Sequence, residues 1–282
     1  MTNIPTKLLA TILPVYLLLG CSGGDEAKPL VKLHSDEDGV QVHGALRAMF
    51  HQGRTDTMVT LDTLLPNPNL YAVGALTDLS GEITIIAGRT VLSFPDGDTT
   101  RAEIPAAPKA AATLLVSADV PAWQSVTTEQ PISFEEIDDA LGQLAAAAGM
   151  NLDTRFPFLL EGKFEDLRWH VIDGTRLAKD AKSHKDHLAA AVQVQQDLAK
   201  ASLIGFYSKS DQGVFTHMGS KTHIHCVTGE PNTTGHVDHV IIPAGTTVKF
   251  PAVSSNHASL AEGRYIKKHT LPDGTIGTDP DP

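Results

Sequence analysis

The sequence predicts an α+β fold with a mixed, partly barrel-like sheet core. Many short runs of β-branched and apolar residues are separated by turn residues, which is the pattern of strands. Only two or three stretches carry the three-to-four-residue spacing of an amphipathic helix. The 282 residues, of which 41% are hydrophobic, suffice for a sizeable core in one large domain or two small ones.

The first twenty residues predict a targeting segment that is not part of the fold. Basic Lys7 precedes an apolar run from Leu8 to Gly20, which is too short to span a membrane as a mature helix. The run ends in LLLGCS, which resembles the bacterial lipobox and implies cleavage before Cys21 and lipid attachment to that residue. Ser22 in place of aspartate favours the outer membrane, on its periplasmic side. The chain is therefore expected to be a lipid-anchored protein of the cell envelope.

The rest of the chain divides into three parts. Residues 21–38 are polar and Gly-rich and predict a tether. A domain is expected at 39–258, as two lobes that meet near residues 150–160, and 259–282 predict a loose acidic tail. The formal net charge of −11 argues against a nucleic-acid partner.

The first lobe is expected to consist mainly of strands. The spacing of Leu46, Met49 and Phe50 predicts a short helix that contains these residues and precedes most of the strands. YAVGAL and EITIIA predict two strands around a DLSG turn, and RTVLSF and Ala112–Ser117 predict two more. Glu82 opens the second of these strands, where an exposed carboxylate would be the ordinary explanation.

Two further helices are predicted after residue 130. Ser133 begins the clearer one, because SFEE is a capping box and Gly149 follows the last turn. Its apolar stripe consists of Ile137, Leu141, Leu144 and Ala148. Ser183–Ala201 predicts the other helix, with His184 and His187 as surface residues near its start.

The block RFPFLLEGKFEDLRWHVIDG predicts two strands joined by a turn at Gly162. Arg168 and His170 alternate with apolar neighbours, so the two basic side chains share one face of the second strand. That face is either an ordinary solvated surface or part of a site. SLIGFYS predicts a further strand that leads into the histidine-rich region.

Three histidines predict a metal site. THIHCV is strand-like, so His223 and His225 lie on one face while Ile224 and Cys226 lie on the other. The turn residues GEPNTTG return the chain to a second strand that His236 opens. Three imidazoles brought together in this way leave a coordination position open for water or substrate, and zinc is the favoured metal.

The second cysteine is read as a core residue. Cys226 lies on the face opposite the histidines and is the only thiol left once Cys21 carries lipid. No intrachain disulfide is therefore expected.

Three blocks together resemble the α-acetolactate decarboxylase family: YAVGALTDLSGEITIIAG, LIGFYS and THIHCVTGEPNTTGHV. With GKFEDLRWHV, the resemblance covers roughly Leu70–Val240. It implies that His223, His225 and His236 hold Zn²⁺ and that Glu82 is an active-site carboxylate. It also implies a pair of α/β lobes, one with a barrel-like sheet, and a tendency to form homodimers.

The chain departs from the family at two places. The family carries an arginine for the substrate carboxylate eight residues after a glycine, whereas eight residues after Gly162 this chain has His170. Arg168 lies two residues earlier on the same face, so either side chain could contact the carboxylate. The region after Phe250 also has no match to the family's C-terminal acidic residue.

The resemblance implies a carbon–carbon lyase that converts acetolactate to acetoin and CO₂. A 2-hydroxy-3-oxo acid has adjacent hydroxyl and carbonyl oxygens that one open zinc can chelate, and the metal then acts as a Lewis acid. Protonation of the product carbon suits a carboxylic acid such as Glu82.

Two alternatives remain open from the sequence. One is a lipid-anchored zinc-binding protein without decarboxylase activity. The other is a cupin-like metalloenzyme, in which Glu230 would join the histidines as a ligand.

Overall fold

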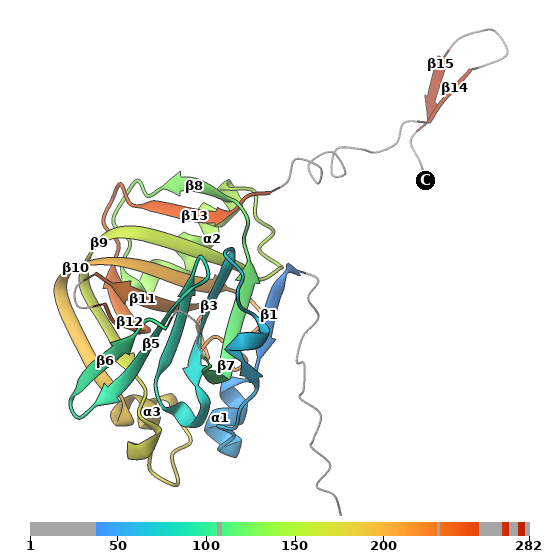
Figure 1. Ribbon diagram of the computed structural model, residues 1–282. Helices are drawn as coiled ribbons and strands as arrows, with labels where there is room; N and C mark the ends of the chain where they lie inside the picture. Colours follow the sequence, from blue (N-terminus) through green and yellow to red (C-terminus); the bar gives the residue numbers. More distant parts are fainter. Residues whose placement is uncertain (1–37, 106–108, 230–231, 254–266, 271–275, 280–282) are drawn as a thin grey trace, which may run out of the picture. The chain divides into compact units, whose positions relative to one another are not determined.

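A computed structural model describes residues 38–105, 109–229, 232–253, 267–270 and 276–279. Within these residues the fold is α+β, as predicted, with two large antiparallel sheets and three α-helices (Figure 1). Every strand pair in both sheets is antiparallel, where the sequence predicted a mixed sheet. The targeting segment, most of the tether and the lipidation residue Cys21 lie outside the described residues. No helix among the described residues is long and apolar enough to cross a membrane.

The first sheet has seven strands and contains the elements predicted for the first lobe. Its strand order is β1-β7-β3-β4-β5-β6, with β2 paired to β7. The predicted short helix is present as α1 (Leu46–Gln52). The strands are β1 (Val40–His43), β2 (Val59–Thr60), β3 (Leu70–Leu76), β4 (Glu82–Ile86), β5 (Arg89–Asp96), β6 (Thr99–Glu103) and β7 (Ala111–Asp119).

The second sheet has six strands and is partly closed. Strand β9 pairs with β10 on one edge and with β12 and β13 on the other, so β10, β11, β12 and β9 form a ring. This closure agrees with the predicted barrel-like core. Its strands are β8 (Trp123–Thr127), β9 (Phe156–Val171), β10 (Val192–Tyr207), β11 (Thr222–Thr228), β12 (Thr234–Ile241) and β13 (Thr247–Pro251).

The chain changes sheet between Asp119, where β7 ends, and Trp123, where β8 begins. This point precedes the predicted lobe division near 150–160. The helix α2 (Ile137–Ala147), which follows this crossing, packs on the second sheet. The predicted capping box is present, with Ser133 and Glu136 bonded to each other at the start of the short 3₁₀ turn before α2.

Two predictions in the second half of the chain are wrong. Gly162 makes no turn, because β9 runs through it as one strand of 16 residues. The second helix, α3 (His184–Ala190), has only seven residues, and the remainder of the predicted helix belongs to β10. Residues 192–196 (VQVQQ) carry a two-residue alternation, and their pairing with β9 outweighs the helix propensity of the alanines around them.

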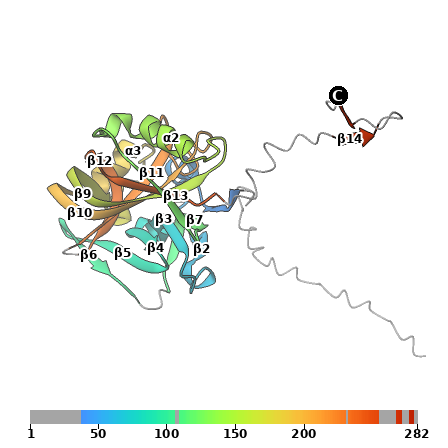
Figure 2. The same ribbon diagram turned by 90° about the horizontal axis from the view of Figure 1, so that it is seen from above.

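The core has one part inside the barrel and another between the sheets. Trp169, Phe158 and Cys226 are fully buried in the first part, where α2 also packs. Leu159 and Phe206 project from the second sheet onto side chains of the first. Figure 2 shows β9 and β10 between α2 and the strands β3, β4 and β5.

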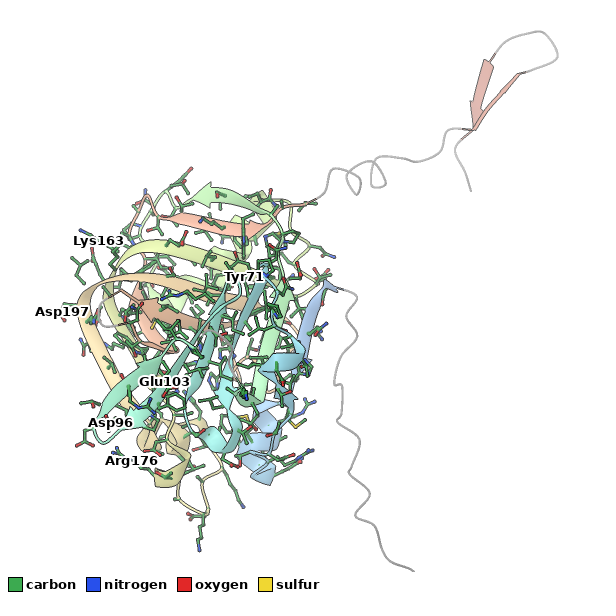
Figure 3. All side chains as sticks on the ribbon, in the orientation of Figure 1. Tyr71, Asp96, Glu103, Lys163, Arg176 and Asp197 are labelled. Atoms are coloured by element: carbon green, nitrogen blue, oxygen red, sulfur yellow. The ribbon has the colours of Figure 1, made fainter. Side chains whose placement is uncertain are left out.

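Charged side chains such as Lys163, Asp96 and Asp197 lie at the outer edges of the molecule (Figure 3). The predicted loose tail contains two short paired strands, β14 (Lys267–Thr270) and β15 (Ile276–Asp279).

Candidate metal centre

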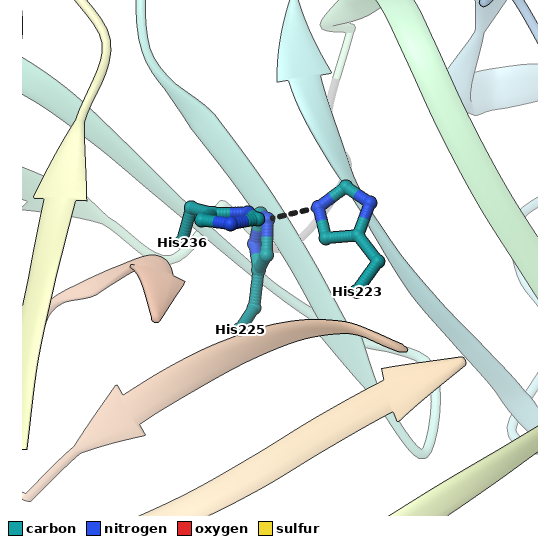
Figure 4. A group of neighbouring side chains, drawn as sticks. All are labelled: His223, His225 and His236. Atoms are coloured by element: carbon teal, nitrogen blue, oxygen red, sulfur yellow. Dashed lines mark hydrogen bonds between the residues drawn. The ribbon is translucent and has the colours of Figure 1, made fainter. Parts of the chain in front are cut away.

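The predicted histidines come together on one face of two neighbouring strands. His223 and His225 lie on β11, and His236 on β12 is paired directly with His225. One ligand nitrogen from each of the three lies within 4.8 Å of the others, and the Nε2 atoms of His223 and His225 are 3.2 Å apart (Figure 4). Ile224 and Cys226 point into the barrel core, as the alternation predicted.

Hydrogen bonds at the far side of the rings fix their orientation. Nδ1–H of His223 donates to the carbonyl oxygen of Phe215 at 2.8 Å. Nδ1 of His225 hydrogen-bonds Oγ1 of Thr84 at 2.9 Å, and that hydroxyl also bonds Thr234. Such outer partners set the tautomer and direction of a ligating imidazole. Nε2 of both rings is thereby left for a common ligand.

These residues fit a zinc ion. Two nitrogens on tetrahedral zinc lie about 3.3 Å apart, given Zn–N distances of about 2.0–2.1 Å, and the two Nε2 atoms are separated by 3.2 Å. Burial is the main reason that the pKa of His223 is lowered to about 4. It also holds the pKa values of His225 and His236 well below the usual range. The rings are therefore neutral at pH 7, which metal ligation requires.

Glu82 is buried beside this cluster, which corrects the ordinary expectation of an exposed carboxylate. Its Oε2 lies 3.8 Å from Nε2 of His225, and its Oε1 accepts a hydrogen bond from the backbone N–H of Ile172 at 3.2 Å. Burial raises the pKa of Glu82 to about 8, against the opposing effects of His170 and the Ile172 bond. In the metal-free protein the carboxyl thus holds its proton at neutral pH.

His170 lies opposite, on β9, with its backbone paired to that of His236. Its Nδ1 is 2.9 Å from each carboxylate oxygen of Asp238. Burial alone would lower the pKa of His170, but the hydrogen bond and the charges of Asp238 and Glu82 outweigh it and raise the pKa.

Arg168 shares the strand face of His170 but does not reach the pocket. Its guanidinium forms two hydrogen bonds with Asp166, at 2.9 and 2.6 Å, and its side chain is 50% exposed. Of the two basic candidates, the structure brings only His170 to the histidine cluster.

Three further histidines, missed as site residues, line the same pocket. His217 packs against His184 with ring centroids 4.0 Å apart and against His236 at 5.2 Å. His187 is buried against Phe50, so its interpretation as a surface residue was wrong. The close spacing of His184 and His187 in SHKDH was the one available signal for a shared helix face.

The pocket lies where the two sheets face each other, because both contribute to its walls. The first sheet and α1 supply mainly apolar side chains, and the second sheet supplies histidines. Its volume is about 50 Å³. The lining residues are Leu46, Met49, Phe50, Gly74, Ala75, Leu79, Glu82, Leu114, His170, Ile172, His184, His187, His217, His223 and His236.

Gly235 allows β12 to approach β9 closely enough for His236 to reach the pocket. A Cβ at this position would lie 2.4 Å from the carbonyl oxygen of His170 and 2.5 Å from Cδ1 of Trp169. Any side chain here would push the strand that carries His236 away from β9.

The metal-free protein is expected to be most stable near pH 6.5. The pKa of His223 is lowered from 6.5 to about 4, and that of His217 from 6.5 to about 3. The contribution of these two histidines to the free energy of unfolding is therefore complete above pH 6.5 and is lost as the pH falls. The pKa of Glu82 is raised from 4.5 to about 8, so its contribution is lost as pH rises to about 8. The raised pKa of His170 acts in the same direction. Thermal unfolding in chelator across pH 4–9 measures this, and a midpoint that rises steadily from pH 6 to 9 would contradict it.

Comparison with known proteins places the chain in a family. A family model described as alpha-acetolactate decarboxylase matches residues 43–272. No curated protein sequence matches the chain.

Solved structures agree on the fold. The alpha-acetolactate decarboxylase of Bacillus subtilis strain 168 is similar with a TM-score of 0.58 at 12% identity, over 75% of this chain and 85% of that one. The acetolactate decarboxylase of B. subtilis subspecies spizizenii has 0.58 at 14%, over 76% and 86%. A Staphylococcus aureus protein of unknown function, described as similar to alpha-acetolactate decarboxylase, has 0.59 at 14%, over 80% and 93%.

The cupin-like alternative has no support in these matches, and its proposed ligand Glu230 lies outside the described residues. The family match, which spans most of the sequence, agrees with the resemblance carried by the glutamate strand and the histidine motif. This chain belongs to the alpha-acetolactate decarboxylase family.

Proposed function

We propose that this protein is a zinc-dependent carbon–carbon lyase that converts acetolactate, a small 2-hydroxy-3-oxo acid, to acetoin and CO₂. One juxtaposition supports this proposal most. Three neutral imidazoles converge at one pocket, and the buried acid Glu82 lies 3.8 Å from one of them. A metal ligand set and a proton donor are thus within reach of the same small molecule.

Zinc held by His223, His225 and His236 would supply a Lewis acid for the substrate's hydroxyl and carbonyl oxygens. When the bond to CO₂ breaks, its electron pair delocalises into the neighbouring carbonyl, and the carbon then needs a proton. Glu82 is suited to deliver it, because burial favours its protonated carboxyl and the N–H of Ile172 fixes one oxygen.

The apolar side chains of the pocket suit the methyl groups of such a substrate. Leu46, Met49 and Ala75 line the pocket together with the histidines and offer apolar contacts for methyl groups.

The substrate carboxylate is assigned to His170. Among the described residues, no lysine or arginine lines the pocket. His170 is the pocket histidine whose pKa is raised, and as an imidazolium it carries a positive charge and an Nε2–H donor. Arg168 is held outside by Asp166.

Replacing His170 with alanine is expected to raise KM for acetolactate by about 10- to 150-fold, since a hydrogen bond to a charged group contributes about 1.5–3 kcal/mol. Arg168→Ala is the matched control on the same strand and should leave KM within about twofold, because its partner is Asp166. Steady-state kinetics of the zinc-loaded variants decides between them. A large KM effect in Arg168→Ala with none in His170→Ala would reverse the assignment.

We further propose that the mature chain is a lipoprotein of the cell envelope, anchored through Cys21 on the periplasmic side of the outer membrane. The LLLGCS sequence after the Lys7-led apolar run supports this. A homodimer, implied by the family resemblance, is also part of the proposal, and light scattering would test it.

Mass spectrometry of the protein from a bacterial host is expected to find a chain that starts at lipid-modified Cys21, because the signal peptidase cleaves before that residue. Cys21→Ser should remain unprocessed and serve as the control. A soluble chain that retains Met1 in the unaltered protein would contradict the anchor.

A further inference from the structure

Strand β12 contains a bulge at Asp238, immediately after the metal-site strand pairing. His236 pairs with His170 and Val237 with Trp169, but the next pair is His239 with Arg168. Asp238 is therefore an extra residue on β12, because the strand advances by two residues there while β9 advances by one. Bulges of this kind change the direction of a side chain and are frequent next to active sites.

The carboxylate of Asp238, at the bulge, faces His170. Both carboxylate oxygens lie 2.9 Å from the same ring atom, Nδ1 of His170, and the two side chains are 23% and 9% exposed. In regular pairing Asp238 would instead stand opposite Arg168, whose guanidinium is exposed.

A second irregularity follows on β9 and produces a comparable carboxylate that points away from the site. Between the pairs His239–Arg168 and Ile241–Glu165 the extra residue is on β9, and Asp166 there has a φ of 45°. Asp166 binds Arg168, Gln195 and His239 farther along the strand, where the side chain of Arg168 is 50% exposed. The two bulges compensate in register, and together they place one carboxylate against the pocket histidine and one against the surface arginine.

We propose that Asp238 is a positioning residue: it holds the ring of His170 with Nδ1 turned away from the pocket, so that Nε2 faces the substrate. The ring orientation follows from the hydrogen bonds alone. The contact between Nε2 and the substrate carboxylate rests on the proposed function.

The ring orientation is tested first, without any substrate. In zinc-loaded protein labelled with ¹⁵N-histidine, the Nδ1 proton of His170 is expected as a downfield ¹H resonance, assigned by its loss in His170→Ala. Asp238→Ala should abolish this resonance, and Asp166→Ala should leave it unchanged. Persistence of the resonance in Asp238→Ala would overturn the proposal, because the ring would then be held by something else.

The kinetic test separates positioning from general damage. Asp238→Ala should raise KM for acetolactate by about 10-fold, with kcat changed by less than about threefold. The double variant His170→Ala/Asp238→Ala should have the KM of His170→Ala, since Asp238 acts only through that ring. Zinc content should stay at about one per chain in all of them.

Asp238→Asn covers the case in which the alanine variant does not fold. It keeps the shape of the bulge and one acceptor oxygen, so an intermediate rise in KM is expected that again vanishes in the His170→Ala background. Additive effects of the two substitutions would overturn the proposal. If zinc-loaded wild type does not consume acetolactate, the proposed function fails, while the ¹⁵N spectra still decide whether Asp238 positions His170.

Discussion

Replacing His236 with alanine is expected to strip zinc from the protein. The three ligand nitrogens lie within 4.8 Å of one another, and removal of one leaves only the pair on β11. A structural zinc site contributes roughly 10–16 kcal/mol across four ligands, so losing one imidazole should weaken affinity by roughly 100-fold or more. Metal analysis after dialysis against a weak chelator would find about one zinc per chain in wild type and far less in the variant.

His184→Ala is the matched control for this experiment. His184 lines the same pocket and packs on His217, but it is not part of the converging triad. The same holds for His187, which packs on Phe50. Equal zinc content in the His236, His184 and His187 variants would show that the triad does not hold the metal.

Replacing Glu82 with glutamine is expected to lower turnover of acetolactate by roughly 100-fold or more with zinc retained. The substitution preserves size and polarity but removes the proton that burial keeps on the carboxyl at neutral pH. The N–H of Ile172 can still donate to the amide oxygen, so the side chain should keep its place. Steady-state kinetics and metal analysis on the same sample measure both quantities.

Glu165→Gln is a suitable control, because Glu165 is an exposed carboxylate on β9. It should have wild-type turnover. If Glu82→Gln retains wild-type turnover with full zinc, the proton comes from another group. If it loses zinc as well, the carboxylate contributes to the metal site instead.

The local patterns in the sequence predicted the convergence of the three histidines, because its geometry follows from strand alternation. His223 and His225 are two residues apart on one strand, so they necessarily share a face, and a short turn suffices to bring His236 beside them. The capping box at Ser133 was equally local, and α2 follows it.

The errors came where tertiary pairing competed with local propensity. The segment after Ala190 is rich in helix-forming residues, yet it pairs with β9 over its whole length as β10. Glycine is common in turns, but Gly162 and the residues on either side of it are all paired with β10. A single sequence does not reveal which of these influences prevails.

The rest of the pocket could not be derived from local pattern, because distant segments meet there. His217 comes from the loop before β11, His184 from α3 and Glu82 from the other sheet. Asp238 contacts His170 at a bulge, which shifts the strand register by one residue. Strand alternation also placed Arg168 and His170 on the same face and could not distinguish them as site residues. In the structure Asp166 holds the arginine at the surface.

The most direct test of the account is CO₂ release from acetolactate by the purified protein, measured as zinc is added back to chelator-treated enzyme. CO₂ and acetoin should form in equal amounts, with activity rising in proportion to bound zinc and reaching its maximum at about one zinc per chain. Fully zinc-loaded wild type that releases no CO₂ above the uncatalysed rate would contradict the proposed decarboxylation, and the histidine cluster would then serve zinc binding alone.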